Sequence, residues 1–160
     1  MAVEAKYTMH HSAVLDADPD TVWAEVRDAV NVVKILFGDT VENVGWTDDG
    51  APERVPSRYN FTLLPAQALV QQQVAGRNEL DRSLTYRSVA RAVCLYDYVA
   101  TYRVLPVSGD PGRSYLEYQR EFKITDDAVP EVVDALMDMM ANQINILRDY
   151  FATPKQDLEP

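Results

Sequence analysis

Hydrophobic and polar residues alternate along several stretches of the chain, and this period of two predicts extended strands. In the stretch 7–15, Tyr7, Met9, His11, Ala13 and Leu15 fall on one face and the intervening residues on the other. Further strands are predicted at 54–64, 69–75, 83–90, 93–105 and 113–124. The connections between them are short, and a loop is predicted at 108–112, so we expect an antiparallel meander.

Two short helices are predicted between the first strand and the later ones. Asp18 is a good N-cap, and Pro19 suits the first helical position, where its missing N–H costs nothing. Val22, Trp23 and Val26 then cover one face of the first helix. The second helical stretch, 30–36, ends at Gly38.

A long amphipathic helix is predicted near the C-terminus, from about residue 129 to about residue 151. One side is acidic or amidic, and the other is apolar except for one glutamine; this second side comprises Val129, Val133, Leu136, Met140, Gln143, Leu147 and Phe151. Such a helix spans about 33 Å and has to bury its apolar side against the sheet. Gln143 then needs a hydrogen-bond partner, which is either a ligand or a strand backbone group.

These elements predict an α+β domain. The 160 residues suffice for one domain, which we place at 1–153, with a flexible tail at 154–160. The formal net charge of −10 repels phosphate backbones and anionic lipids, so neither nucleic acid nor membrane is an expected partner. The single cysteine favours a reducing, cytoplasmic setting.

Four segments resemble motifs of one protein family. Residues 18–23 (DPDTVW) are similar to its "AP–VW" opening, 97–104 (DYVATYRV) to its "–NY–A–RV" strand, 116–118 (LEY) to its "VEW/VES" strand, and 144–151 to its closing helix. The family is the START-like superfamily, also called Bet v 1-like or SRPBCC, and the chain looks most like its polyketide cyclase/dehydrase-type branch.

This resemblance implies the helix-grip fold: a curved antiparallel sheet of about six or seven strands, two short helices after strand 1, and a long C-terminal helix enclosing a cavity. It also implies a hydrophobic small-molecule ligand or substrate in that cavity, with no metal and no cofactor. Nothing in the sequence sets the oligomeric state, so both a monomer and a homodimer are kept.

Two functions stay open. One is a cofactor-independent polyketide cyclase or aromatase of natural-product metabolism. The other is a non-catalytic protein that carries or sequesters a hydrophobic metabolite, including for self-resistance. The chain has no P-loop, G-x-G-x-x-G or G-x-S-x-G motif, which disfavours phosphoryl transfer, hydride transfer and serine hydrolysis.

The strand 93–105 supplies the first candidate site residues. One face is the more apolar and aromatic, and we place it inward; it carries Cys94, Tyr96, Tyr98, Ala100 and Tyr102. Tyr98 matches the family tyrosine that faces the ligand, which implies a phenol that orients or protonates a carbonyl oxygen. Tyr96 and Tyr102 are then expected to contact the ligand.

The strand 113–124 is ambiguous. Its hydrophobic pattern places Leu116, Tyr118, Arg120, Phe122 and Ile124 in the core. The resemblance implies the opposite, because Glu117 matches a glutamate that reaches the ligand. A carboxylate in such a pocket has a raised pKa and acts as a general acid or base.

Other candidates come from the remaining elements. His11 shares a face with apolar residues and is a potential proton shuttle. Arg58 either anchors an anionic or enolate oxygen or lies exposed. Leu136, Met140 and Gln143 are the ligand contacts expected from the last helix. His10 and His11 point to opposite faces of a regular strand, so no metal site is predicted.

Overall fold

The computed structural model describes residues 5–152, and the predicted tail at 154–160 lies outside the described residues. The chain begins with strand β1 (Lys6–Leu15), then helices α1 (Pro19–Val26) and α2 (Ala29–Phe37) and a 3-10 turn, η1 (Gly38–Thr40). Six strands follow: β2 (Val41–Thr47), β3 (Ser57–Leu63), β4 (Ala68–Asn78), β5 (Ser83–Ser88), β6 (Leu95–Val107) and β7 (Asp110–Ile124). Helix α3 (Pro130–Ala152) ends the described chain.

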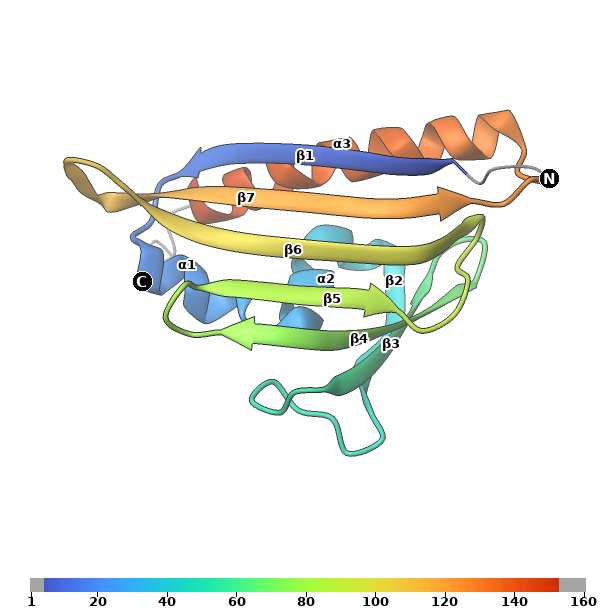
Figure 1. The fold of residues 1–160 in the computed structure, drawn as a ribbon, viewed down its shortest axis with the longest axis horizontal. Helices are drawn as coiled ribbons and strands as arrows, with labels where there is room; N and C mark the ends of the chain where they lie inside the picture. Colours follow the sequence, from blue (N-terminus) through green and yellow to red (C-terminus); the bar gives the residue numbers. More distant parts are fainter. Residues whose placement is uncertain (1–4, 153–160) are drawn as a thin grey trace, which may run out of the picture.

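The seven strands form one antiparallel sheet in the order β1-β7-β6-β5-β4-β3-β2. The first two strands therefore lie at opposite edges, and α1 and α2 carry the chain between these edges (Figure 1). All later neighbours are consecutive in sequence, which confirms the predicted antiparallel meander and the α+β class.

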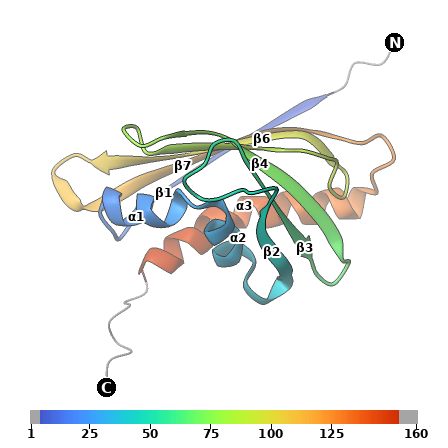
Figure 2. The same ribbon diagram turned by 90° about the horizontal axis from the view of Figure 1, so that it is seen from below.

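The sheet is curved, and all three helices lie on its concave side (Figure 2). Strands β2 and β3 curl down beside α2, while α3 runs along the other half of the sheet, against β1. The core fills the space between these layers, with Leu15, Leu116 and Leu147 fully buried. Helix α3 is amphipathic, and it can exclude water from its apolar side only by lying on this concave face.

Local sequence signals explain how the helices begin. The Asp18 carboxylate accepts a hydrogen bond from the Thr21 backbone N–H at 3.4 Å, with Pro19 in the first turn, as predicted. Helix α2 is capped in the same way by Asp28, whose carboxylate accepts from the Asn31 N–H at 3.1 Å. These caps fix where the chain leaves β1 and enters the helices that cover one end of the sheet.

The connection between β6 and β7 is tighter than predicted. Val107 pairs with Asp110, so the turn contains only Ser108 and Gly109, and the rest of the predicted loop at 108–112 belongs to β7. Gly109 has φ +78°, which favours glycine in a two-residue hairpin turn.

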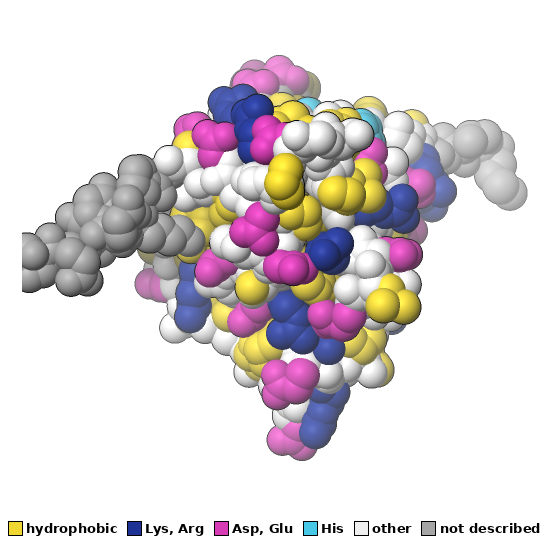
Figure 3. Space-filling view, turned by 90° about the vertical axis from the view of Figure 1, so that its left-hand side faces the viewer, with side chains coloured by type: hydrophobic (Ala, Val, Ile, Leu, Met, Phe, Trp, Pro, Cys, Tyr) yellow, Lys and Arg dark blue, Asp and Glu magenta, His cyan; other side chains and the backbone are white. Residues whose placement is uncertain are grey.

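Charged side chains of both signs are interspersed with hydrophobic ones over this end of the molecule (Figure 3). Of the helices within residues 5–152, none has the length and hydrophobicity that crossing a membrane requires.

Candidate functional site

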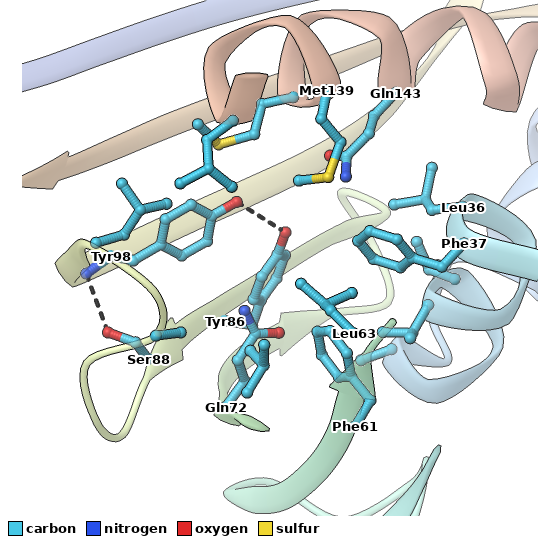
Figure 4. A pocket seen from close by; sticks show the side chains of 18 of the residues that line it. Leu36, Phe37, Phe61, Leu63, Gln72, Tyr86, Ser88, Tyr98, Met139 and Gln143 are labelled. Carbon is cyan, nitrogen blue, oxygen red and sulfur yellow. Dashed lines mark hydrogen bonds between the residues drawn. The ribbon is translucent and has the colours of Figure 1, made fainter. Parts of the chain in front are cut away.

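A cavity of about 90 Å³ lies between α2, the middle of the sheet and α3. Aliphatic and aromatic side chains form most of its wall, with Phe61 and Leu63 from β3, Leu36 and Phe37 from α2, and Met139 from α3 among them (Figure 4). This volume is well below the roughly 300–1,000 Å³ of sites for drug-sized molecules. A cavity of this size holds about one ring of a ligand.

Tyrosine hydroxyls form a large share of the polar side-chain atoms of the wall. The hydroxyl of Tyr86 hydrogen-bonds to that of Tyr118, and it lies 3.3 Å from the hydroxyl of Tyr98, which is 3.4 Å from that of Tyr118. Tyr102 stacks on Tyr118 with ring centroids 4.1 Å apart, and its buried hydroxyl has no hydrogen-bond partner among the residues that the structure describes. We call Tyr86, Tyr98, Tyr102 and Tyr118 the tyrosine cluster.

Strand pairing builds the cluster. Tyr102 on β6 is the register partner of Tyr118 on β7, and Tyr86 on β5 pairs with Ala100 on β6. Side chains on one face of neighbouring strands lie close enough to stack, so three adjacent strands bring their phenols together. Polar atoms of Gln72 and Ser88 complete the wall; Gln72 accepts from Tyr59, and Ser88 accepts from the backbone N–H of Tyr98.

A buried guanidinium lies directly behind this wall. Arg120 on β7 is 1% exposed, and its guanidinium carbon lies 3.7 Å from the centre of the Tyr118 ring. Its Nη2 donates a 2.8 Å hydrogen bond to Oε1 of Gln143 on α3. Within residues 5–152, Nε and Nη1 of Arg120 find no partner, and no carboxylate forms an ion pair with it.

The positive charge of Arg120 gives the phenols of the tyrosine cluster different pKa values. Burial holds the pKa of Tyr86, Tyr98 and Tyr102 well above the usual value, so these groups remain protonated. Burial also acts to raise the pKa of Tyr118, but the charge of Arg120 and the hydrogen bonds from neighbouring phenols outweigh it and lower that pKa. Tyr118 is therefore the most acidic hydroxyl of the cluster and its strongest hydrogen-bond donor.

The structure brings five of the sequence-predicted site residues to the cavity wall. They come from β6 and from α3, and they are Tyr98, Tyr102, Leu136, Met140 and Gln143. Their positions agree with the predicted strand and helix faces. The role assigned to Tyr98 in proton transfer stays a prediction.

Tyr96 does not line the cavity, although the period of two placed it inward. The register of β6 shifts between Tyr96 and Val99, with Asp97 at φ +49°. This bulge reverses which residues face inward, so Leu95 lines the cavity and the Tyr96 ring lies 5.9 Å from the Lys123 ammonium instead. The prediction of a ligand contact at Tyr96 is therefore wrong.

Glu117 and Arg58 also lie away from the cavity. Glu117 is on the outer face of β7, 3.9 Å from His10, while Tyr118, Arg120 and Phe122 are buried. The hydrophobic pattern of this strand was thus the correct guide, and the resemblance was not. Arg58 is exposed and donates to Gln73 across the outer face.

His11 faces inward as expected, but toward Arg120 and not into the cavity. Burial, and then the charge of Arg120, lower its pKa below 6.5, and its buried Nδ1 has no hydrogen-bond partner within the range 5–152. The folded protein thus binds a proton at His11 less readily than the unfolded chain does.

Acidification should consequently destabilise the protein through His11. The stability contributed by the neutral imidazole is present above the unfolded pKa of 6.5 and is lost as the pH falls toward the lower folded value. We expect His11→Gln to remove this part of the pH dependence. Urea denaturation at about pH 8 and about pH 5 measures it, and identical losses in wild type and variant would contradict the assignment.

Sequence reasoning missed the roles of several wall residues. Tyr86, Gln72 and Ser88 lie in predicted strands but carry no motif. Tyr118 and Arg120 were assigned to the core by the pattern, without any sign that their side chains stack there. The one available signal was a charged residue at an inward position, which is rare unless the charge is paired or used.

The fold of this chain is similar to that of several proteins of known structure. No family model matches the sequence, and no curated protein matches it. The Zhui aromatase/cyclase from Streptomyces sp. R1128 superposes with a TM-score of 0.74 at 15% identity, over 92% of this chain and 94% of that one. Norcoclaurine synthase from Thalictrum flavum, in a truncated form, gives a TM-score of 0.73 at 13% identity, over 97% and 99% of the two chains.

A Bacillus thuringiensis protein superposes with a TM-score of 0.72 at 13% identity, over 92% of this chain and 100% of that one. These likenesses extend over nearly the whole length of each protein. The chain therefore has the helix-grip fold that the sequence resemblance implied.

Proposed function

We propose that the protein binds a small, largely hydrophobic molecule in the cavity between sheet and α3, with an oxygen of that molecule against the tyrosine cluster. The observation that carries this proposal is the convergence of the Tyr86, Tyr98 and Tyr118 hydroxyls on one apolar cavity. An apolar wall with a few convergent polar groups is the usual form of a small-molecule site. The hydroxyls fix the orientation of the ligand, and the aliphatic side chains exclude water from it.

The reaction that this site supports best is a cyclase or aromatase step on a polyketide-like intermediate. The fold shared with a Streptomyces aromatase/cyclase supports this proposal. Confinement holds a flexible chain near a reactive conformer, which lowers the barrier by several kcal/mol. Tyr98 and Tyr118 would donate hydrogen bonds to carbonyl oxygens as enolate character develops.

One observation favours the alternative, a carrier or sequestering protein. Within the described chain, the cavity wall contains no carboxylate, histidine or lysine side chain. Tyr86, Tyr98 and Tyr102 stay protonated because their pKa values are raised, so they can donate hydrogen bonds but cannot serve as general bases. A site of this kind binds a hydrophobic metabolite without having to change it.

Tyr98→Phe should separate the two functions. An enzyme is expected to change the product distribution of a reactive poly-β-ketone surrogate, and loss of the Tyr98 hydroxyl should reduce that effect about 10–1,000-fold. A carrier should instead yield a co-purified ligand that native mass spectrometry recovers unchanged. Tyr115→Phe, on the outer face of β7, is the matched control.

The two assays have clear contrary outcomes. If wild type leaves the surrogate's products unchanged, the catalytic proposal fails. If no hydrophobic compound co-purifies and none binds to the purified protein, ligand binding itself is contradicted.

A further inference from the structure

Arg120 carries a full positive charge into the interior, and no negatively charged partner for it lies within residues 5–152. An unpaired buried ion is costly, and most buried charges are paired with an opposite charge or bound to a metal. Here one guanidinium nitrogen is hydrogen-bonded to the Gln143 amide, and the other two find no partner in the described part of the chain.

The charge is connected to the cavity through two wall residues. Tyr118 lies between Arg120 on one face of its ring and Tyr102 on the other, and its hydroxyl end points into the tyrosine cluster. Gln143 holds the guanidinium with its carbonyl oxygen, and its side chain reaches the cavity from α3 (Figure 4). Arg120 therefore acts on a bound molecule through neighbours, which makes it a positioning residue.

The groups that face Arg120 are uncharged or positive. His11 on β1 is its neighbour in the sheet, the tyrosine cluster supplies phenols from β5, β6 and β7, and Gln143 is the contact from α3. The overall charge of −10 works against anions at the surface, so this local positive charge is the feature that would attract one.

We propose that the cavity selects a planar ligand with an acidic hydroxyl, a phenol or an enolised β-dicarbonyl, and binds it as its oxyanion. The ligand oxygen accepts from the Tyr118 hydroxyl, and the charge of Arg120 behind that ring balances the negative charge. The hydroxyl proton of the ligand goes to the solvent, and no other covalent bond forms or breaks in this step. This inference rests on the proposed function and adds the chemical class of the ligand.

The test uses 4-nitrophenol and 4-nitrotoluene, two single-ring probes of similar shape. Only 4-nitrophenol ionises, and its phenolate has its own visible absorbance, which reports the form that is bound. Near the solution pKa of the probe, wild-type protein should shift bound 4-nitrophenol toward the phenolate. It should also bind this probe about 10–100-fold more tightly than 4-nitrotoluene.

Gln143→Glu is the decisive variant, because it places a carboxylate of the same size 2.8 Å from the guanidinium. The new ion pair should neutralise Arg120 and weaken the binding of 4-nitrophenol about 10–100-fold more than it weakens the binding of 4-nitrotoluene. Gln119→Glu is the matched control: it adds the same charge on the exposed face of β7 and should change neither affinity. Arg120→Met should give the same result as Gln143→Glu by removing the charge.

The outcomes distinguish this inference from the function on which it rests. If wild type binds both probes but Gln143→Glu and Arg120→Met change the two affinities equally, the inference is overturned and cavity binding stands. Binding of 4-nitrophenol in its neutral form also overturns it. Failure of wild type to bind either probe would overturn the proposed function and this inference together.

Discussion

Replacing Arg120 by methionine and Gln143 by leucine together is expected to stabilise the folded protein by about 1–3 kcal/mol. The double variant removes a buried charge whose desolvation costs several kcal/mol and the one amide that partly compensates it. Methionine and leucine fill similar volume with apolar atoms. The gain is reduced by the loss of the Arg120–Tyr118 ring contact, which contributes about 0.5–2 kcal/mol.

The single variants should behave differently from the double one. Arg120→Met leaves the Gln143 carbonyl without a donor, which costs about 1–3 kcal/mol and offsets most of the gain. Gln143→Leu leaves a fully buried guanidinium without a protein acceptor, and it should be the least stable of the three. Urea denaturation of all four proteins, with equal m-values, measures this coupling as a double-mutant cycle.

A double variant less stable than wild type would show that Arg120 serves the fold. The expected result has the opposite meaning: the charge lowers stability and is explained by what it does to a bound ligand. Functional sites commonly carry such a cost, since activity and stability make different demands on the same side chains. The cycle therefore bears on the ligand class without using a ligand.

Most of the fold could be predicted because its signals are local. Asp18 and Pro19 mark the start of α1, the period of two identifies β1 and β7, and the amphipathic face identifies α3. The order of these elements then leaves few topologies, because sequential strands prefer to pair and short connections do not cross. The predicted length of the connection between β6 and β7 is too long, because Pro111 suggested a loop and yet lies within β7.

The site was harder to predict, because it depends on how the strands register. The bulge at Asp97 reverses the inward face of β6, and a non-glycine residue at positive φ gives no warning of it in the sequence. Tyr98 stayed inward and Tyr96 did not, although the two are only one period apart. A family motif locates such a strand, but it does not fix the direction of each side chain.

The faces of β7 show how the hydrophobic pattern outweighed the resemblance. Turning Glu117 inward would also have turned Glu121 and Lys123 inward and exposed Leu116 and Phe122. The observed face buries one charged residue instead of three, and burial of each further charge costs several kcal/mol. A single buried arginine, held by a ring and an amide, is the less costly arrangement.

Leu147→Ala is expected to lower the free energy of unfolding by about 2–5 kcal/mol. Leu147 is fully buried, in the half of α3 that packs into the core together with Ile144 and Phe151. Alanine removes most of the apolar side chain and leaves a void that the close-packed surroundings fill only in part. Thermal denaturation should therefore show a lower midpoint, with the α-helical and β-sheet signals lost together.

Leu136→Ala is the matched control on the same helix. Leu136 is half-buried and lines the cavity, so its truncation enlarges an existing space and removes less packing. We expect a stability loss of about 1 kcal/mol or less and a site that accepts a larger probe than wild type accepts. Equal losses for the two variants would mean that the first half of α3 is packed as tightly as the second. In that case the helix would not leave room for a ligand, and the common basis of both proposed functions would be lost.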